Sequence, residues 1–233
     1  MKKIIISLFL SILISPVFAQ KIIDKKLSWS KDQLVNLNLK FGDSIRVRYW
    51  DKQEVSIRMS VSINSGKLND AFLVTSSSSS DELILKTDFD EKMLKQGKKE
   101  DCPKDKSSSI KNENGDGERY YVCSEISYQV FLPREARLKL ESINGNIDIE
   151  GASTAVFAKT ISGYVDMTWP KTKGANLAMQ TITGEVYSDL KIDFKNKEKN
   201  PIVGYLLKGA LNGGGPEVHL ESISNNVYLR KRN

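Results

Sequence analysis

The stretch that decides the fold is Ser142-Ile143-Asn144-Gly145-Asn146-Ile147. Three similar stretches follow it in the C-terminal half: Thr160-Ile161-Ser162-Gly163-Tyr164-Val165, Thr181-Ile182-Thr183-Gly184-Glu185-Val186 and Ser222-Ile223-Ser224-Asn225-Asn226-Val227. In each copy, apolar residues lie two and four positions before the Ser or Thr, and five and seven positions after it, except for Ser188. Each copy therefore predicts a strand, a tight turn and a second strand with one buried face, and the copies are expected to share one core.

The copies begin 18, 21 and 41 residues apart. Because the last interval is about two units long, a further copy is expected within Val203–Gly215. A constant unit of this length predicts a β-solenoid or β-helix-like stack, in which neighbouring strands lie about 4.8 Å apart. An antiparallel meander, with Asn144-Gly145 as a hairpin turn, is the alternative. Asn225 replaces the turn glycine in the fourth copy, which indicates a backbone position of positive φ rather than a ligand contact.

Residues 27–90 alternate between apolar and polar side chains and predict an antiparallel β-sheet. The repeat region should continue from this sheet, so the whole chain is expected to be all-β. We divide it into an N-terminal β-region, 20–133, and a β-repeat region, 134–233. The N-terminal region carries a polar insertion, 91–119, which is too poor in apolar residues to order itself and is either functional or disordered.

Residues 1–19 have the pattern of a secretory signal peptide. Lys2 and Lys3 precede an apolar run from 4 to 14, and Val17-Phe18-Ala19 is typical of a cleavage site. The run is shorter than the roughly 20 residues of a membrane span, although a retained signal anchor is an alternative. We expect a mature chain that begins at Gln20, is exported to the periplasm or cell surface and has no transmembrane segment. Export also argues against a nucleic-acid partner.

The formal net charge is +6, and removal of Lys2 and Lys3 leaves +4. The excess is spread over lysine-rich loops and the Arg230-Lys231-Arg232 tail. Such loops are typical of a solvated surface, and a basic face for anionic glycans or membranes is the sharper alternative.

The chain has two cysteines, Cys102 and Cys123. An even number of cysteines in an exported chain predicts a disulfide, which would close the base of the polar insertion. Two cysteines cannot complete a tetrahedral metal site, so neither a metal nor a cofactor is expected. The one histidine, His219, lies in a strand pattern and is interpreted as a solvent-facing strand residue rather than a catalytic base.

Four segments carry a family resemblance: Phe41–Val55, Ile126–Pro133, Leu138–Ile149 and Asn225–Lys231. Together they resemble the exported bacterial "putative adhesin" β-repeat family, which is of unknown function and common in Bacteroidetes. The resemblance covers most of residues 35–231, and the insertion around the cysteines departs from it. It implies a β-helix-like or β-sandwich-like repeat fold and provides no catalytic residues.

One outward column of the repeat contains polar and aromatic side chains: Asp148, Asp166, Tyr187 and Tyr228. In stacked coils the two carboxylates would lie about 5 Å apart, which is the separation in a retaining glycosidase. No arginine, histidine or calcium-type cluster is evident beside them. Outward aromatic residues can instead stack on sugars, and Tyr164, Tyr187 and Tyr228 are the first candidates.

These observations favour a non-enzymatic, exported β-repeat protein that acts as an envelope-associated scaffold or adhesion-like module. The alternative is a glycan-binding module that uses Tyr164, Tyr187, Tyr228, Asp148 and Asp166. A polysaccharide-cleaving enzyme built on Asp148 and Asp166 is the third possibility. The expected partner is an envelope glycan or protein, and the terminal coil is predicted to support a homodimer.

Overall fold

The computed structural model describes residues 20–103, 108–111, 119–195 and 204–232, with the backbone alone for 108–111. The predicted signal peptide, 1–19, lies outside the described residues. The described chain is almost entirely β-strand, which confirms the all-β prediction.

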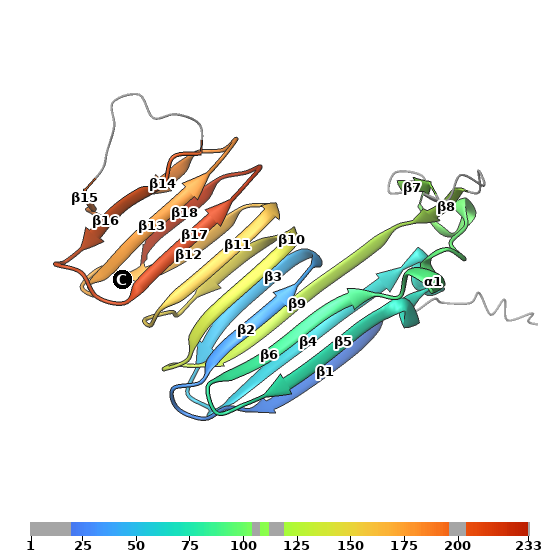
Figure 1. Ribbon diagram of the computed structural model, residues 1–233, viewed down its shortest axis with the longest axis horizontal. Coiled ribbons are helices and arrows are strands. Elements are labelled where there is room, and N and C mark those ends of the chain that lie inside the picture. Colours follow the sequence, from blue (N-terminus) through green and yellow to red (C-terminus); the bar gives the residue numbers. More distant parts are fainter. Residues whose placement is uncertain (1–19, 104–107, 112–118, 196–203, 233) are drawn as a thin grey trace, which may run out of the picture.

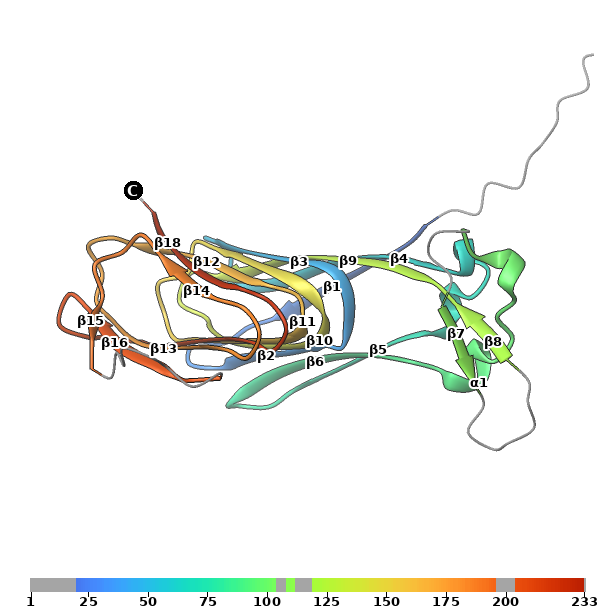
Figure 2. The same ribbon diagram turned by 90° about the horizontal axis from the view of Figure 1, so that it is seen from above.

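The strands form two layers, joined by one long strand that bends from one layer into the other (Figure 2). Layer A contains, in spatial order, β5 (Phe72–Ser78), β6 (Glu82–Phe89), β2 (Leu34–Leu39), the first half of β10 (Arg137–Glu150), β11 (Val156–Ser162), β17 (Glu217–Ser222), β13 (Ala175–Thr181), β16 (Leu207–Leu211) and β15 (Asp193–Phe194). Layer B contains β1 (Lys21–Ser28), β4 (Glu54–Ile63), β9 (Ser124–Pro133), β3 (Phe41–Trp50), the second half of β10, β12 (Val165–Pro170), β18 (Val227–Arg232) and β14 (Val186–Ser188).

The two strands of each repeat copy lie in opposite layers and pair with the strands of neighbouring copies. In layer A, β10 pairs with β11, β11 with β17, and β17 with β13, all in parallel. In layer B, β10, β12, β18 and β14 pair in parallel in the same way. The repeat turns are therefore not hairpins. The sheet nevertheless remains open, with β1, β5, β14 and β15 at its edges, so a closed solenoid or β-helix is not confirmed.

The last copy in the sequence is not the last in space. β17 and β18 lie between β11–β12 on one side and β13–β14 on the other (Figure 1). The expected extra copy within Val203–Gly215 is wrong for the residues described there. β16 pairs antiparallel with β13 and extends the edge of layer A, because the chain returns along β13 instead of starting another turn between the layers.

The antiparallel prediction for residues 27–90 holds only in part. β1 with β4, and β5 with β6, are antiparallel, and β4 also pairs antiparallel with β9. β2 and β3, however, are not paired with each other: β2 is parallel to β6 and β10, and β3 is parallel to β9 and β10. The bend after Leu39 moves the chain from layer A to layer B, and alternation alone cannot distinguish that from a hairpin.

The core lies between the layers and is built from the residues that the repeat predicts to point inward. From layer A these are Leu138, Leu140, Val156, Ala158, Leu177, Met179, Val218 and Leu220, all at most 4% exposed. From layer B they are Ile147, Ile149, Val165, Met167, Val227 and Leu229, all fully buried. Val186, on edge strand β14, is only half-buried.

The positive-φ interpretation of the turn holds at two of four positions. Gly145 and Gly163 have φ of +145° and +138°, whereas Gly184 and Asn225 lie outside that region. The three glycines share a different constraint, since a Cβ on each would clash with the backbone of the neighbouring turn, at 2.8 Å for Gly145, 2.2 Å for Gly163 and 2.3 Å for Gly184. Close approach of the turns, rather than φ alone, explains the repeated glycine.

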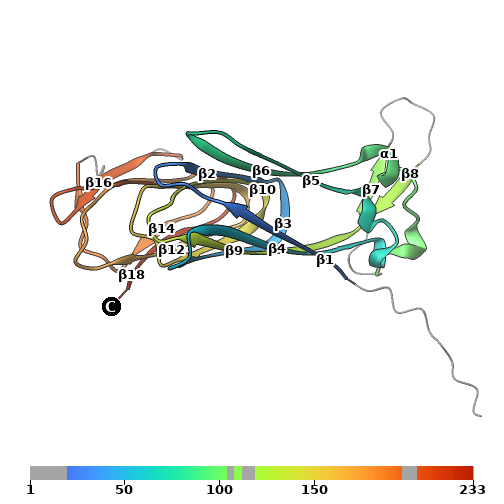
Figure 3. The same ribbon diagram turned by 90° about the horizontal axis from the view of Figure 1, so that it is seen from below.

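The polar insertion lies at the opposite end of the molecule from β13 and β16 (Figures 1 and 3). Its described elements are α1 (Glu91–Leu94), η3 (Lys99–Asp101), β7 (Ser108–Lys111) and β8 (Arg119–Val122), and they lie beside η1 (Asn64–Gly66) and η2 (Asn69–Ala71). Asp90 caps α1 by accepting hydrogen bonds from the backbone of Lys92 and Met93. β7 and β8 form a separate two-stranded sheet.

Candidate functional site

The predicted outward column exists on layer B, and we call it the outer ladder. Its members, in spatial order, are Arg46, Asp148, Asp166, Tyr228 and Tyr187, each directly opposite the next in a parallel pair of strands. Tyr228 lies beside Asp166, and Tyr187 ends the ladder, because β18 lies between β12 and β14. The structure therefore brings these side chains together, while their role in binding stays a prediction.

The two tyrosines of the ladder pack on each other and on Tyr164, which lies beside the ladder just before β12. The rings of Tyr187 and Tyr228 are stacked, with centroids 5.3 Å apart and planes 12° apart. Tyr164 meets Tyr228 edge to face at 6.3 Å. The Arg230 guanidinium lies 4.7 Å from the centre of the Tyr228 ring. Tyr187, on the edge strand, is 46% exposed, so it offers the most accessible aromatic surface of the three.

The two carboxylates of the ladder have different surroundings. Arg230 Nε donates to both oxygens of Asp166, at 2.9 and 2.8 Å, and this carboxylate is 21% exposed. Asp148 accepts a longer hydrogen bond, 3.5 Å, from the Tyr164 hydroxyl. Burial, and then the charge of Asp166, raise the pKa of Asp148, against the lowering effect of Arg48 and Arg46.

This arrangement fits a binding surface better than a glycosidase pair. A retaining enzyme needs one carboxylic acid and one free carboxylate that acts as nucleophile. Asp148 has the raised pKa of an acid, but both oxygens of Asp166 are occupied by Arg230. The ladder instead contains three charged side chains followed by two stacked tyrosines across parallel strands, which can present hydrogen-bond donors, acceptors and one ring to an extended ligand.

Sequence reasoning missed the arginines around the ladder. Arg46 and Arg48 alternate with the buried residues of β3, and Arg230 follows Tyr228 by two residues, so all three lie in the outward phase of their strands. This alternation, which is visible in the sequence, is the signal that could have identified the arginines as neighbours of the ladder. Arg48 pairs with Glu150 at 3.0 Å. Trp50, also on β3, stacks on Phe131 of β9 with centroids 5.0 Å apart.

The three tryptophans and the histidine belong to the scaffold. Trp29 and Trp169 are buried, at 6% and 0% exposed. Each donates its indole N–H to the carbonyl four residues later, as Trp50 also does. His219 is half-buried on layer A, packs against Phe157 at 4.8 Å and lies 3.4 Å from Glu221, which itself pairs with Lys159. None of these residues extends the outer ladder.

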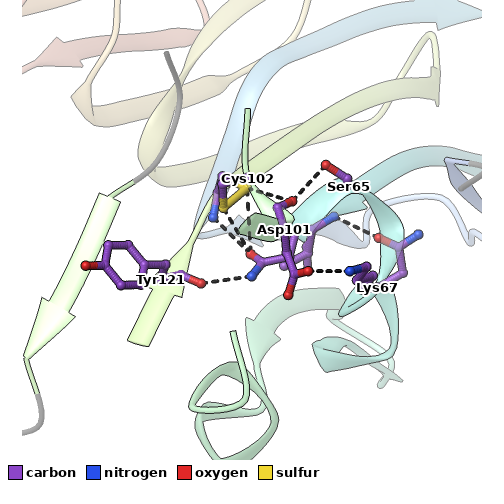
Figure 4. The surroundings of a disulfide bond; sticks show 9 residues. Ser65, Lys67, Asp101, Cys102 and Tyr121 are labelled. Carbon is purple, nitrogen blue, oxygen red and sulfur yellow. Dashed lines mark hydrogen bonds and ion pairs between the residues drawn. A yellow bond between two sulfur atoms is a disulfide. The ribbon is translucent and has the colours of Figure 1, made fainter. Parts of the chain in front are cut away.

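The Cys102–Cys123 disulfide is present and lies at the insertion end of the molecule (Figure 4). Buried Asn64 connects it to the sheet by accepting the Cys123 N–H at 3.0 Å and donating to the Tyr121 carbonyl at 2.8 Å. Lys67 pairs with Asp101 and holds the pKa of that carboxyl below its usual value. The disulfide therefore fastens the insertion to β4 and β9 and has no contact with the ladder.

Within the described ranges, no group of three or more His, Cys, Asp or Glu side chains is placed to hold a metal ion. In the same part of the chain, no helix has both the length and the apolar character needed to cross a membrane.

The fold is shared with a protein described as a putative cell adhesion protein from Clostridium sporogenes. The two sequences are 12% identical. The structural match covers 91% of this chain and 100% of the chain in that crystal structure, with a TM-score of 0.54. Structures described as putative adhesins from Bacteroides fragilis and Parabacteroides merdae are 9% and 7% identical over 91% of this chain and 97% of each, with TM-scores of 0.24 and 0.23, too low to support an argument. The sequence matches no family model and no curated protein.

Proposed function

We propose that this chain is a non-enzymatic, adhesion-like module of the cell envelope and that the outer ladder is its contact surface. The observation that carries the proposal is the ladder itself, a row of paired charges and tyrosines that crosses neighbouring strands of a large, rigid sheet. The description of the Clostridium sporogenes protein as a putative cell adhesion protein agrees with a non-enzymatic role. Export through the segment 1–19 is part of the proposal.

The first test asks whether the mature chain, residues 20–233, binds bacterial envelope polysaccharides on an array. Tyr187→Ala should weaken binding by about tenfold, because the stacking of one sugar ring on an aromatic side chain contributes on the order of 1–2 kcal/mol. Leu73→Ala is the matched control, because Leu73 is 44% exposed but lies on β5 of layer A. Equal loss in both variants, or no loss in either, would remove the ladder from the contact surface.

A scaffold that contacts proteins is the second candidate, and the same surface would serve it. Two results together would favour the scaffold over the glycan-binding module. The chain would bind no envelope polysaccharide, and it would crosslink in cells to a protein only when the ladder is intact. The enzyme hypothesis is tested separately. Any hydrolysis found in a reducing-sugar screen should be abolished by Asp148→Asn and by Asp166→Asn, and unchanged activity would exclude these carboxylates.

Self-association through the terminal coil belongs to the same proposal. The last coil of the sequence, β17 and β18, is paired on both sides and is not the exposed end that was expected. In space the terminal coil is formed by β13 and β14, and β14 leaves one edge of layer B unpaired among the described strands. Light scattering on residues 20–233 should give the mass of a dimer, and a monomer at all concentrations would exclude this part of the proposal.

A further inference from the structure

A small open pocket lies on the outer face of layer B, next to the outer ladder. Its cavity volume is about 320 Å³, and the residues that line it are Arg48, Tyr49, Glu150, Gly151, Thr168 and Arg232. The pocket exists because β10 ends at Glu150 and the next residue has no side chain. Gly151 has φ +91°, and a Cβ there would lie 3.2 Å from Tyr49 and 3.6 Å from the Arg232 guanidinium.

The charges of the pocket are only partly compensated. Arg48 pairs with Glu150 at 3.0 Å. Arg232, on the other side of Gly151, forms no ion pair with any described residue. Two arginines and one glutamate leave a single positive charge at the pocket.

The pocket also holds a polar atom that lacks a partner. The Thr168 hydroxyl is buried and makes no hydrogen bond to any described residue. Buried polar groups almost always have a hydrogen-bond partner, so this hydroxyl can gain one from a ligand oxygen if its side chain rotates toward the cavity. Arg232 lines the cavity and the Thr168 hydroxyl is buried in its wall, and this pair of groups matches the oxygen atoms of an anion that also carries hydroxyl groups.

The pocket and the outer ladder form one continuous surface. Thr168 follows Asp166 by two residues on β12, and Arg232 follows Arg230 by two residues on β18, in the same outward phase. Two residues of a strand span roughly 7 Å, a distance that neighbouring units of one polysaccharide chain can bridge. A chain bound along this surface would place one unit in the pocket and the next beside Asp166 and Tyr228.

We propose that this pocket binds the carboxylate of a hexuronic acid unit, so that the preferred ligand is an acidic polysaccharide. The inference rests on the proposed function, because it names the ligand class of the same surface. A single surplus positive charge matches a monovalent carboxylate, and Glu150 repels a dianion such as phosphate or sulfate. The cavity lies at the small end of the range of ligand pockets and therefore suits one sugar ring.

The test is an amide NMR titration of ¹⁵N-labelled residues 20–233 with sodium glucuronate, with glucose and sodium sulfate as comparisons at equal ionic strength. Glucuronate should give saturable shifts at Gly151, Thr168 and Arg232, and glucose should give none. Arg232→Gln should weaken glucuronate binding by about tenfold or more, and Thr168→Val should weaken it by several-fold. Arg58→Gln is the matched control, because it removes the same charge from the same face on β4 and should change the affinity by less than about twofold.

Three results would overturn the inference: no saturable shift with glucuronate, equal shifts with sulfate, or an unchanged affinity in Arg232→Gln with an otherwise native spectrum. These results are separable from failure of the proposed function. If polysaccharide binding is present but independent of Arg232, the ladder remains the contact surface and the pocket does not. If glucuronate enters the pocket but no polysaccharide binds and Tyr187→Ala has no effect, the pocket stands and the proposed function fails.

Discussion

At the scale of single residues, the repeated Ser/Thr and Gly form a set of contacts between neighbouring turns. Thr160 donates to the Gly145 carbonyl at 3.1 Å, Ser222 to the Gly163 carbonyl at 2.7 Å, and Thr181 to the Asn225 carbonyl at 2.6 Å. Each buried hydroxyl therefore reaches the turn residue of the adjacent copy. The turns at Gly163 and Asn225 accept this contact on one side and provide it on the other, which explains why the same residue types recur in the sequence.

The turn glycine is expected to be intolerant of even one methyl group. In Gly163→Ala the new Cβ would lie 2.2 Å from the Gly145 carbonyl oxygen, at a φ of +138°. We expect the free energy of unfolding, measured by urea denaturation, to fall by about 3 kcal/mol or more. Gly213→Ala is the control. Gly213 has φ +84° but nothing within 4 Å of a Cβ, so only the backbone strain of about 1 kcal/mol should remain. Equal effects in the two variants would contradict close packing of the turns.

Removal of a repeat hydroxyl should be costly, whereas exchange of Thr for Ser should not. Thr160→Val keeps the shape of the side chain but leaves the Gly145 carbonyl without its side-chain donor, and Thr160 is fully buried. The free energy of unfolding should fall by about 1–3 kcal/mol. Thr160→Ser should lie much closer to wild type, because Ser222 occupies the equivalent position in the next copy. Calorimetry of both variants would detect the difference, and a neutral Thr160→Val would exclude the role of the hydroxyl.

Asp148 should make the stability of the fold depend on pH. Its pKa is raised in the folded protein, first by burial and then by Asp166, relative to the ordinary value of 3.8. The stabilising contribution of its neutral form is therefore complete below the unfolded pKa and is lost as the pH rises through the folded pKa. Asp148→Asn should consequently be more stable than wild type at pH 7, and this advantage should disappear as the pH falls below about 3.8.

Urea denaturation at several pH values measures this difference. Asp166→Asn is the comparison, because it removes the charge that pairs with Arg230 and should be no more stable than wild type at pH 7. A pH-independent gain in Asp148→Asn would mean that the substitution acts through packing rather than through ionisation.

At the scale of elements, the disulfide should stabilise the protein by restricting the unfolded chain. Its cysteines are 21 residues apart in sequence. A cross-link over a loop of this length contributes about 3 kcal/mol in the chain-entropy model. In the double variant Cys102→Ala, Cys123→Ala, the free energy of unfolding measured by urea denaturation should be lower by about 3 kcal/mol. Wild type under reducing conditions should show the same decrease. An unchanged midpoint would show that the contacts of Asn64 hold the insertion without the bond.

The sequence predicted burial well and strand pairing poorly. Alternation in β3 and β10 identifies the inward residues, because each strand has one buried face, whichever strand it pairs with. The partner depends on contacts between distant residues, such as Gly163 against Gly145, which a local pattern does not contain. An Asn-Gly pair is equally typical of a hairpin, and only the structure shows that residues 144–145 carry the chain from one layer to the other.

The candidate site was predictable to the same extent. A constant repeat unit places Asp148, Asp166 and Tyr228 at equivalent positions, so their column follows from the sequence alone. The pocket beside it does not, because it requires the chain to turn at Gly151 and Arg232 to lie next to that turn. The order of Tyr187 and Tyr228 within the column also depends on which copy neighbours which, and the chain order of the copies predicts it wrongly.

At the scale of the whole molecule, the position of β17–β18 should make the repeat region cooperative. In an ordinary repeat array, deletion of the last copy leaves the others folded. Here β13 pairs with β17 and β14 pairs with β18, and these two pairings connect β13 and β14 to the earlier copies. A chain that ends at 216 should therefore lose protease resistance in residues 171–195 as well. A synthetic peptide of residues 217–232, added in trans, should restore that resistance, and intact residues 171–195 in the truncated chain would contradict the prediction.

The same inserted strands set the order in which the molecule can be assembled. The ribosome makes β13 and β14 before the segment that must separate them from β11 and β12. Until that segment emerges, any contact between β11–β12 and β13–β14 is one that the native structure does not contain. The nascent chain must therefore either keep this gap open or reopen a premature contact. A protein with this layout therefore completes its core only after residues 217–232 have been synthesised.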